Sequence, residues 1–366
     1  MSSVGGGKEE VSDKLKAPFP YFGGKAAVAD VVWRAFGMDV RHYIEPFFGS
    51  GAVLLARPLP FEGYETVNDK DGMVSNFWRA LQHDPDGVAR YADWPLNEND
   101  LHARHYWLVS HKESLQERLE GDPEFYDVKA AGWWVWGMSC WIGGNWCAGG
   151  GPWRSVDGRL VRVGGDGVNR KRPLLPTGAG IHAACHTGVG VKRCLPHISH
   201  PGSIITYGYG LSGEERVQAL IARFRALADR LRDVRVCCGD WKRVCGCDSL
   251  LYDKSPTAIF LDPPYSTYHR DQSIYAVEMT TADEVREWAI AHGNDPRLRI
   301  ALCGYEGEHK MPPTWRVYAW KANGGYGNHG NKRGKANCYR ERIWFSPHCL
   351  PIEREEASFP LLEVAQ

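Results

Sequence analysis

The strongest constraint on the fold is a pair of apolar runs in the second half of the chain, each ending in a polar cluster. Residues 234–238 run into Gly239-Asp240-Trp241, and residues 258–261 run directly into Asp262-Pro263-Pro264-Tyr265. Short continuous apolar runs are typical of strands covered on both faces. Open sheets of parallel strands bind ligands outside the carboxyl ends of those strands. The pattern therefore predicts an α/β fold with polar chemistry along one edge of the sheet.

The rest of the chain supplies further helices and strands in alternating order. This order predicts a mostly parallel sheet. A Ser212 and Glu215 capping box indicates a helix start ahead of an apolar stripe at helical spacing. Helices are also expected over 26–36, from 52 and over 282–292, and strands over 42–44, 65–67, 299–303, 315–320 and 340–345, the last two paired antiparallel.

Charge and cysteine content restrict where the protein acts. Forty-four Lys and Arg balance forty-four Asp and Glu, so any nucleic-acid surface must be a local concentration of charge. Two such concentrations are the segments 152–200 and 323–342. Eleven cysteines without an export signal favour the reducing cytoplasm, and no stretch is apolar and long enough to predict a membrane span.

The turn at Asp262 and Pro263 suits the binding of an amine. An adenine amine is a poor nucleophile because its lone pair is delocalised into the ring. The Asp262 carboxylate and the Pro263 carbonyl would accept hydrogen bonds from both amine protons, since two prolines fix the turn. Tyr265 would stack on a flipped base. A plain proline turn that ends a strand is the alternative.

A second motif lies near the N-terminus, where a strand leads through Gly49-Ser50-Gly51 into a helix. Glycines there allow backbone amides to approach a cofactor closely, and the helix N-terminus favours its carboxylate. Asp69, about twenty positions further on, suits hydrogen bonding to ribose hydroxyls. A solvated carboxylate at the end of a strand is the alternative interpretation of Asp69.

The order of these motifs resembles the Dam-like adenine methyltransferases of the alpha group. Gly23-Gly24-Lys25, the segment 45–51, a long intervening region and the segment 262–265 follow the family's order, and the resemblance covers residues 17–82 and 212–346. It implies a Rossmann-like, S-adenosyl-L-methionine-dependent methyltransferase sheet with an inserted target-recognition domain. The expected organisation is a disordered leader over 1–16, a catalytic domain over 17–83 and 202–350, the insertion over 84–201 and a tail over 351–366.

The resemblance also implies roles for individual residues. Glu45, Phe47, Phe48, Gly49 and Gly51 would hold the methionine end of the cofactor, Asp69 its ribose, Asp240 and Trp241 its adenine ring, and Tyr21 and Lys25 would line the pocket of cofactor and target. Asp262, Pro263, Pro264 and Tyr265 would be catalytic, with Ser266, Tyr268 and Tyr275 as candidates for a lid over the base. The expected reaction is a direct in-line displacement on an adenine flipped out of double-stranded DNA, which needs neither a metal nor a covalent enzyme intermediate.

The insertion departs from the family's pattern. It carries a Trp-rich segment over 133–146 and then Arg170, Lys171 and Arg172, which we expect to bind phosphates together with Lys332 and Arg333. His182, Cys185, Cys194 and His197 have a spacing that would suit a structural zinc ion, with unliganded loop residues as the alternative. The target sequence cannot be inferred from these residues.

Four other functions remain open at this point. A related enzyme could methylate a cytosine amine, an RNA adenine or a protein glutamine, although Asp rather than Asn at position 262 favours DNA adenine. A relative that binds DNA without catalysis is the alternative from a different class, and cofactor binding would distinguish it. No obligate protein partner is implied, and a restriction, solitary or viral role is equally compatible with the sequence.

Overall fold

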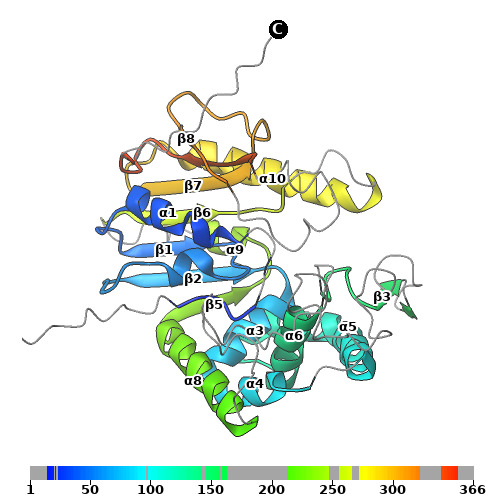
Figure 1. Cartoon of the computed structure of the whole chain (residues 1–366). Coiled ribbons are helices and arrows are strands. Elements are labelled where there is room, and N and C mark those ends of the chain that lie inside the picture. Colours follow the sequence, from blue (N-terminus) through cyan, green and yellow to red (C-terminus); the bar gives the residue numbers. More distant parts are fainter. Residues whose placement is uncertain are drawn as a thin grey trace, which may run out of the picture.

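The computed structural model describes residues 15–19, 21, 24–95, 98–141, 146–156, 159–162, 213–246, 255–265, 272–321 and 339–352. Its centre is a seven-stranded sheet with the strand order β5-β2-β1-β6-β7-β9-β8 (Figure 1). The strands are β1 (His42–Glu45), β2 (Tyr64–Asp69), β5 (Val234–Cys238), β6 (Thr257–Leu261), β7 (Leu298–Tyr305), β8 (Arg316–Ala319) and β9 (Glu341–Phe345).

The first five strands of this order are parallel to one another. Strand β9 lies antiparallel between β7 and β8, which confirms the expected antiparallel pairing of the last two strands. The register of the strands places Ile44 of β1 beside Ile259 of β6, and Ile259 beside Ile300 of β7. The expected Rossmann-like α/β fold is therefore confirmed.

Alternate side chains of the strands enter two separate hydrophobic clusters. Tyr43 and Phe260 belong to the first cluster, whereas their neighbours Ile44 and Ile259 belong to the second. This alternation places helices on both faces of the sheet. The first cluster includes residues of α1 (Ala29–Phe36), α2 (Ala52–Leu55), α3 (Gly72–His83) and α8 (Gly213–Leu231), and the second includes residues of α9 (Lys242–Cys245) and α10 (Gln272–His292).

Three further helices occupy a region in which the sequence showed little periodicity. They are α4 (Pro85–Ala92), α5 (Glu98–Gly121) and α6 (Val128–Cys140), and Figure 1 shows them with α3 and α8 beyond β5. Asp84 and Asp127 cap α4 and α6, because their side chains accept hydrogen bonds from the Gly87 and Ala130 amides at 2.8 Å. Trp134 and Trp136 of α6 are 2% and 1% exposed. A helix buried on most sides carries apolar residues all round, so its periodicity is hidden.

A small hairpin lies against α5. Its strands β3 (Trp153–Val156) and β4 (Arg159–Arg162) pair antiparallel. The buried ring of His105 on α5 holds it: one ring nitrogen is 3.0 Å from the Gly150 carbonyl and the other accepts the Trp153 amide proton at 3.3 Å. Both ring nitrogens are thus used in the neutral form, and burial lowers the pKa of His105 to about 4.

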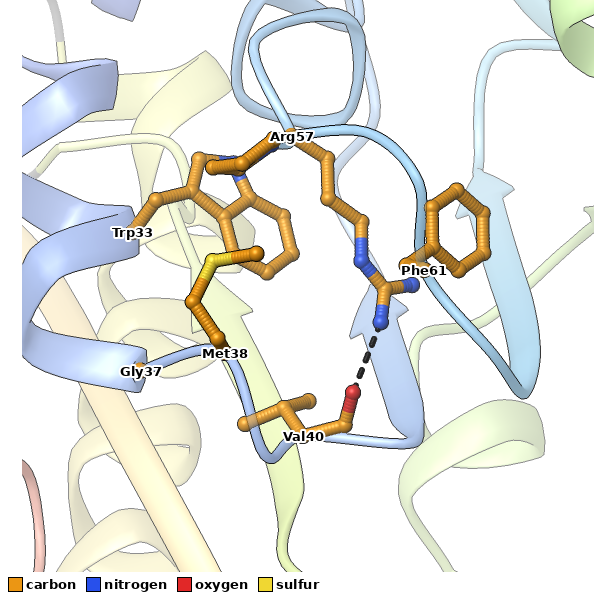
Figure 2. A pocket seen from close by; sticks show the side chains of 7 residues that line it. Trp33, Gly37, Met38, Val40, Arg57 and Phe61 are labelled. Carbon is orange, nitrogen blue, oxygen red and sulfur yellow. Dashed lines mark hydrogen bonds between the residues drawn. The ribbon is translucent and has the colours of Figure 1, made fainter.

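The amino end of the sheet is closed by a buried ion cluster. The Glu65 carboxylate pairs with Arg57 at 3.0 Å and with Arg230 at 2.6 Å, and each of the three side chains is at most 7% exposed. Figure 2 shows the Arg57 guanidinium beside Phe61, with a hydrogen bond to the Val40 carbonyl. The small pocket drawn there lies at the end of the sheet opposite to the carboxyl ends of the strands.

Most predicted elements begin and end within two residues of those in the structure, and the predicted bounds of β5 are the observed ones. Two helices differ by more than this. The helix expected over 26–36 is divided into a 3-10 turn, Lys25–Ala27, and α1, which begins at Ala29. Helix α10 begins at Gln272, ten residues earlier than expected at 282. In the described residues no helix is both long and apolar enough to cross a membrane.

Candidate active site

The carboxyl ends of β1 and β6 lie side by side in the middle of the sheet. From β1 the chain continues outward to β2 on one side, whereas β6 leads to β7 on the other, so the strand order reverses between β1 and β6. Such a switch point is where open α/β sheets bind ligands. Glu45 at the end of β1 and Asp262 after β6 flank it. The two motifs found in the sequence therefore meet at one place.

The loop after β1 is fastened to the end of β2 by Asp69. The two oxygens of this carboxylate accept hydrogen bonds from the backbone amides of Gly49 and Asp71, each at 2.8 Å. Gly49 and Gly51 have φ angles of 47° and 64°, a region that glycine adopts without strain. Burial raises the pKa of Asp69 to about 7, and the Asp71 carboxylate also raises it, although the two amide hydrogen bonds oppose the shift.

Aromatic side chains surround this loop. A Cβ atom on Gly49 would lie 2.5 Å from the Tyr21 ring, so glycine allows that ring to lie directly against the loop. The Trp78 indole donates a hydrogen bond to the Gly49 carbonyl at 2.9 Å. Phe48 is 3% exposed and packs on Trp78 in the core. The Phe48 side chain thus supports the loop from below, and Tyr21, at 38% exposure, covers it from the solvent side.

Glu45 is a buried carboxylate at the floor of the switch point. It is 3% exposed and accepts a hydrogen bond from the Tyr43 hydroxyl at 2.8 Å. Burial raises the pKa of Glu45, and the nearby Asp262 carboxylate raises it further, whereas the Tyr43 hydrogen bond opposes the shift.

Asp240 and Trp241 follow β5 on the same edge of the sheet. Asp240 is exposed, and its carboxylate accepts the Lys242 amide proton at 3.0 Å, which fixes the turn into α9. Trp241 is 4% exposed and packs between Phe47, at a centroid distance of 6.3 Å, and Trp288, at 6.0 Å. The Phe47 ring thus joins the loop after β1 to the turn after β5.

Asp262 lies at the centre of a charged network. The Lys25 ammonium is 2.8 Å from one carboxylate oxygen, and the Tyr265 hydroxyl is 3.1 Å from the other. Lys25 is 3% exposed, and although burial disfavours its charge, the Asp262 carboxylate raises the pKa of Lys25. The Lys25 nitrogen also lies 5.2 Å from the centre of the Tyr265 ring. A lysine that would pass for a surface residue in the sequence is therefore a buried cation of the site.

Glu341 is a member of this network that the sequence did not indicate. It begins β9, is 5% exposed, and its carboxylate lies 3.0 Å from the Tyr265 hydroxyl. Tyr305 of β7 packs edge-on against the Tyr265 ring at 4.7 Å. A single glutamate at the start of an apolar strand gives no signal of its own. Only the insertion of β9 beside β7 brings it to Asp262.

Several predicted residues lie outside the described part of the chain. They are Arg170, Lys171, Arg172, Lys332, Arg333, the candidate lid residues Ser266 and Tyr268, and the zinc candidates His182, Cys185, Cys194 and His197. Tyr275 lies on α10 at a position where only the backbone is described. Within the described residues, no group of three or more His, Cys, Asp or Glu could hold a metal ion.

Comparison with known proteins finds a family model that matches part of the chain. Residues 21–128 match the model of the D12 class N6 adenine-specific DNA methyltransferases, a range that contains Tyr21, Lys25, the loop after β1 and Asp69. A search of the curated proteins finds no match. The match covers less than half of the chain, and it shows that this part is similar to the D12 class. Together with the methyltransferase-like sheet, it supports an adenine-specific DNA methyltransferase, a class of enzyme that takes its methyl group from S-adenosyl-L-methionine.

Proposed function

We propose that the enzyme methylates the exocyclic amine of an adenine flipped out of double-stranded DNA, by direct in-line displacement. The observation that carries the proposal is the position of Asp262 at the switch point, beside the glycine loop that Asp69 fastens. A nucleophile held at Asp262 and a methyl donor held on the loop would face each other across this point. Positioning and electrostatics then account for the catalysis.

The residues after β6 suit the activation of an amine. Asp262 and the Pro263 carbonyl accept the two amine protons, which draws the lone pair of the nitrogen out of the ring. The Lys25 ammonium, 2.8 Å from one oxygen of Asp262, holds this carboxylate in place beside the turn. Tyr265 holds the base by stacking, while its hydroxyl is fixed by the carboxylates of Asp262 and Glu341.

The residues around the loop fit S-adenosyl-L-methionine. When bound, this cofactor supplies an electrophilic methyl group on a sulfonium. Gly49 and Gly51 would allow the loop amides to approach its carboxylate, and Asp69 would accept hydrogen bonds from its ribose hydroxyls. The Phe47 ring, backed by the buried Trp241, would offer aromatic surface to its adenine. Tyr21 would cover the cofactor at the loop, and the carboxyl groups of Glu45 and Asp262 would favour a sulfonium cation beside them.

The hairpin of β3 and β4 supports a DNA-binding role for the region 84–201. Arg154 and Arg159 are exposed on the same face of the hairpin, together with Val156 and Val161 at 46% and 49% exposure. We include these two arginines among the phosphate contacts, with Arg170, Lys171, Arg172, Lys332 and Arg333 from the sequence. Arg232, exposed at the end of α8, is a matched control for their substitution.

We also propose the cytoplasm as the compartment of the enzyme. The seven cysteines that the structure describes form no disulfide with one another, as expected of a protein in a reducing environment.

The test is transfer of labelled methyl from S-adenosyl-L-methionine to genomic DNA that lacks adenine methylation, followed by nucleoside analysis and mapping of the modified bases. We expect methyladenine in one short sequence context. Asp262→Asn should lower the rate by roughly 100-fold or more while cofactor binding persists. Full activity of this variant would refute the assigned role of Asp262. Label that reaches RNA or protein but not DNA would refute the proposed substrate.

A further inference from the structure

Two carboxylates share one phenol in the site. The Tyr265 hydroxyl lies 3.1 Å from Asp262 and 3.0 Å from Glu341. A phenol carries one proton, so Tyr265 donates to one carboxylate at a time. When one of the two carboxyl groups is protonated, Tyr265 can accept from it and donate to the other. The three groups thus form a continuous hydrogen-bonded path between the amine-binding oxygen atoms and β9.

The charges around Glu341 are unbalanced. The groups that face it are Lys25, Asp262 and Tyr265, together with Cys303, Tyr305 and Glu308 on or just after β7. Among these, Lys25 is the cation, and its ammonium is 2.8 Å from Asp262. Burial raises the pKa of Glu341, and Asp262 adds to the shift while Lys25 opposes it. Arg342, the next residue, turns away and pairs with Glu306 at 2.8 Å.

Methylation of the amine requires that a proton leave the site. The lone pair of the amine nitrogen forms the new N–C bond, and the C–S bond breaks with its electron pair remaining on sulfur. The nitrogen then carries a positive charge until it loses one of its protons. Asp262 accepts from the amine and is therefore the first acceptor, but a protonated Asp262 cannot activate the next substrate.

We propose that Glu341 is the second acceptor of this proton, which reaches it from Asp262 through the Tyr265 hydroxyl. The carboxyl proton of Asp262 moves to the Tyr265 oxygen as the hydroxyl proton of Tyr265 moves to Glu341. Asp262 is again a carboxylate, the phenol is unchanged, and the proton leaves Glu341 for solvent. This inference rests on the proposed function, because it assumes an amine at Asp262. Glu341 is a positioning and relay residue that does not touch the substrate.

The test compares Glu341→Gln with the wild-type enzyme in single-turnover methyl transfer over a range of pH. Glutamine has nearly the same shape and still accepts a hydrogen bond from Tyr265, but it cannot take up a proton at neutral pH. We expect the rate to fall by about 100-fold. The acidic limb of the pH profile should move to lower pH, because a protonated Glu341 cannot take up the proton and the glutamine removes this titration. Cofactor affinity should not change.

Two further variants make the result decisive. Glu306→Gln removes an exposed carboxylate, 62% exposed and paired with Arg342, and should leave the rate and the pH profile as in the wild type. Tyr265→Phe interrupts the path but keeps the ring, so combining it with Glu341→Gln should slow the reaction no further than the slower single change. If Glu341→Gln does not fold, Tyr265→Phe and Glu341→Asp provide the same comparison, with partial activity expected for the aspartate.

The outcomes separate this inference from the proposed function. A wild-type rate and profile in Glu341→Gln would overturn the relay, and so would a uniform loss of rate with no shift of the acidic limb, which indicates orientation of Tyr265 alone. A wild-type enzyme that transfers no methyl to DNA would instead overturn the proposed function. A slowed variant with a shifted limb, beside an unchanged Glu306→Gln, would support the relay.

Discussion

The substitution Asp69→Asn tests how the loop after β1 is held for the cofactor. Both oxygens of this carboxylate accept a backbone amide proton at 2.8 Å, from Gly49 and from Asp71. An asparagine has one carbonyl oxygen, so it can accept from only one of these amides, and its NH₂ group would face the other donor. We expect the Gly49 amide to lose its partner, since the Asp71 amide lies only two residues away on the same turn.

The size of the effect follows from the kind of bond that is lost. A hydrogen bond to a charged acceptor contributes about 1.5–3 kcal/mol, and a buried donor left without a partner adds to the cost of the change. Loss of about 2 kcal/mol from the bound state corresponds to a roughly 30-fold rise in the cofactor Kd. Loss of the ribose contacts would raise the Kd further. The free energy of unfolding should fall by less than the free energy of cofactor binding, because the loop is only one part of the folded structure.

Protonation of Asp69 gives the same test without a mutation. The pKa of Asp69 is raised to about 7 in the folded state, whereas an aspartate in the unfolded chain has a pKa of about 4. Between these values the folded state binds a proton that the unfolded chain has released. The stability that this proton provides is lost as the pH rises through 7. Ribose hydroxyls require the ionised form, so cofactor affinity should change in the opposite direction. It should rise about tenfold from pH 6 to pH 8.

Titration calorimetry with S-adenosyl-L-methionine measures both effects. The control is Asp71→Asn, which removes a neighbouring carboxylate but retains a side chain that can cap α3. We expect Asp71→Asn to bind within about threefold of the wild type, and Asp69→Asn to bind weakly and independently of pH. Equal Kd values for the wild type and Asp69→Asn at pH 8 would refute the reasoning.

Three other predictions concern stability, the hairpin and DNA binding. Glu65→Gln leaves two buried arginines without a counter-charge, so the free energy of unfolding in urea should fall by about 3–5 kcal/mol, and a loss below about 1 kcal/mol would argue against the buried ion cluster. The pKa of His105 is lowered to about 4, so the stability it gives the hairpin is present above about pH 6.5 and is lost as the pH falls toward 4. Hydrogen exchange of the hairpin amides should therefore speed up in acid relative to α8, and equal protection at pH 4 and pH 7 would contradict this. Arg154→Ala with Arg159→Ala should reduce the salt dependence of DNA binding by roughly two phosphate contacts, and an unchanged slope would remove the hairpin from the interface.

The sequence predicted the strands of the sheet with good accuracy. Glu45 ends one buried apolar run and Asp262 follows another. Because the carboxyl ends of parallel strands lie at the same edge of a sheet, the strand pattern alone predicts that these two residues lie close together. Asp69 likewise lies at the end of a strand, β2. Local patterns suffice where a residue's position is fixed by the strand that carries it.

Other features depended on tertiary packing and could not be predicted. Helix α6 is apolar on almost all sides because it is buried, so its residues show no amphipathic stripe. The role of Glu341 depends on β9 lying antiparallel beside β7, which no local pattern specifies. Lys25 was expected near the cofactor and target only by resemblance. Its burial follows from the packing of its own side chain against the rings of Tyr265 and Trp320, which are distant in the sequence.

The position of β1 between β2 and β6 limits which parts of the chain can fold alone. A fragment that ended at residue 141 would contain the whole range 21–128 that matches the family model, but it would lack β6 and β5, the outer neighbours of β1 and β2. Its two-stranded sheet would expose an open edge on each side, and Glu65 would lose Arg230, one of its two buried partners. During synthesis, the N-terminal strands must wait until β5 and β6 have emerged. The first half of the sheet is therefore the part most exposed to incorrect strand pairing before the chain is complete.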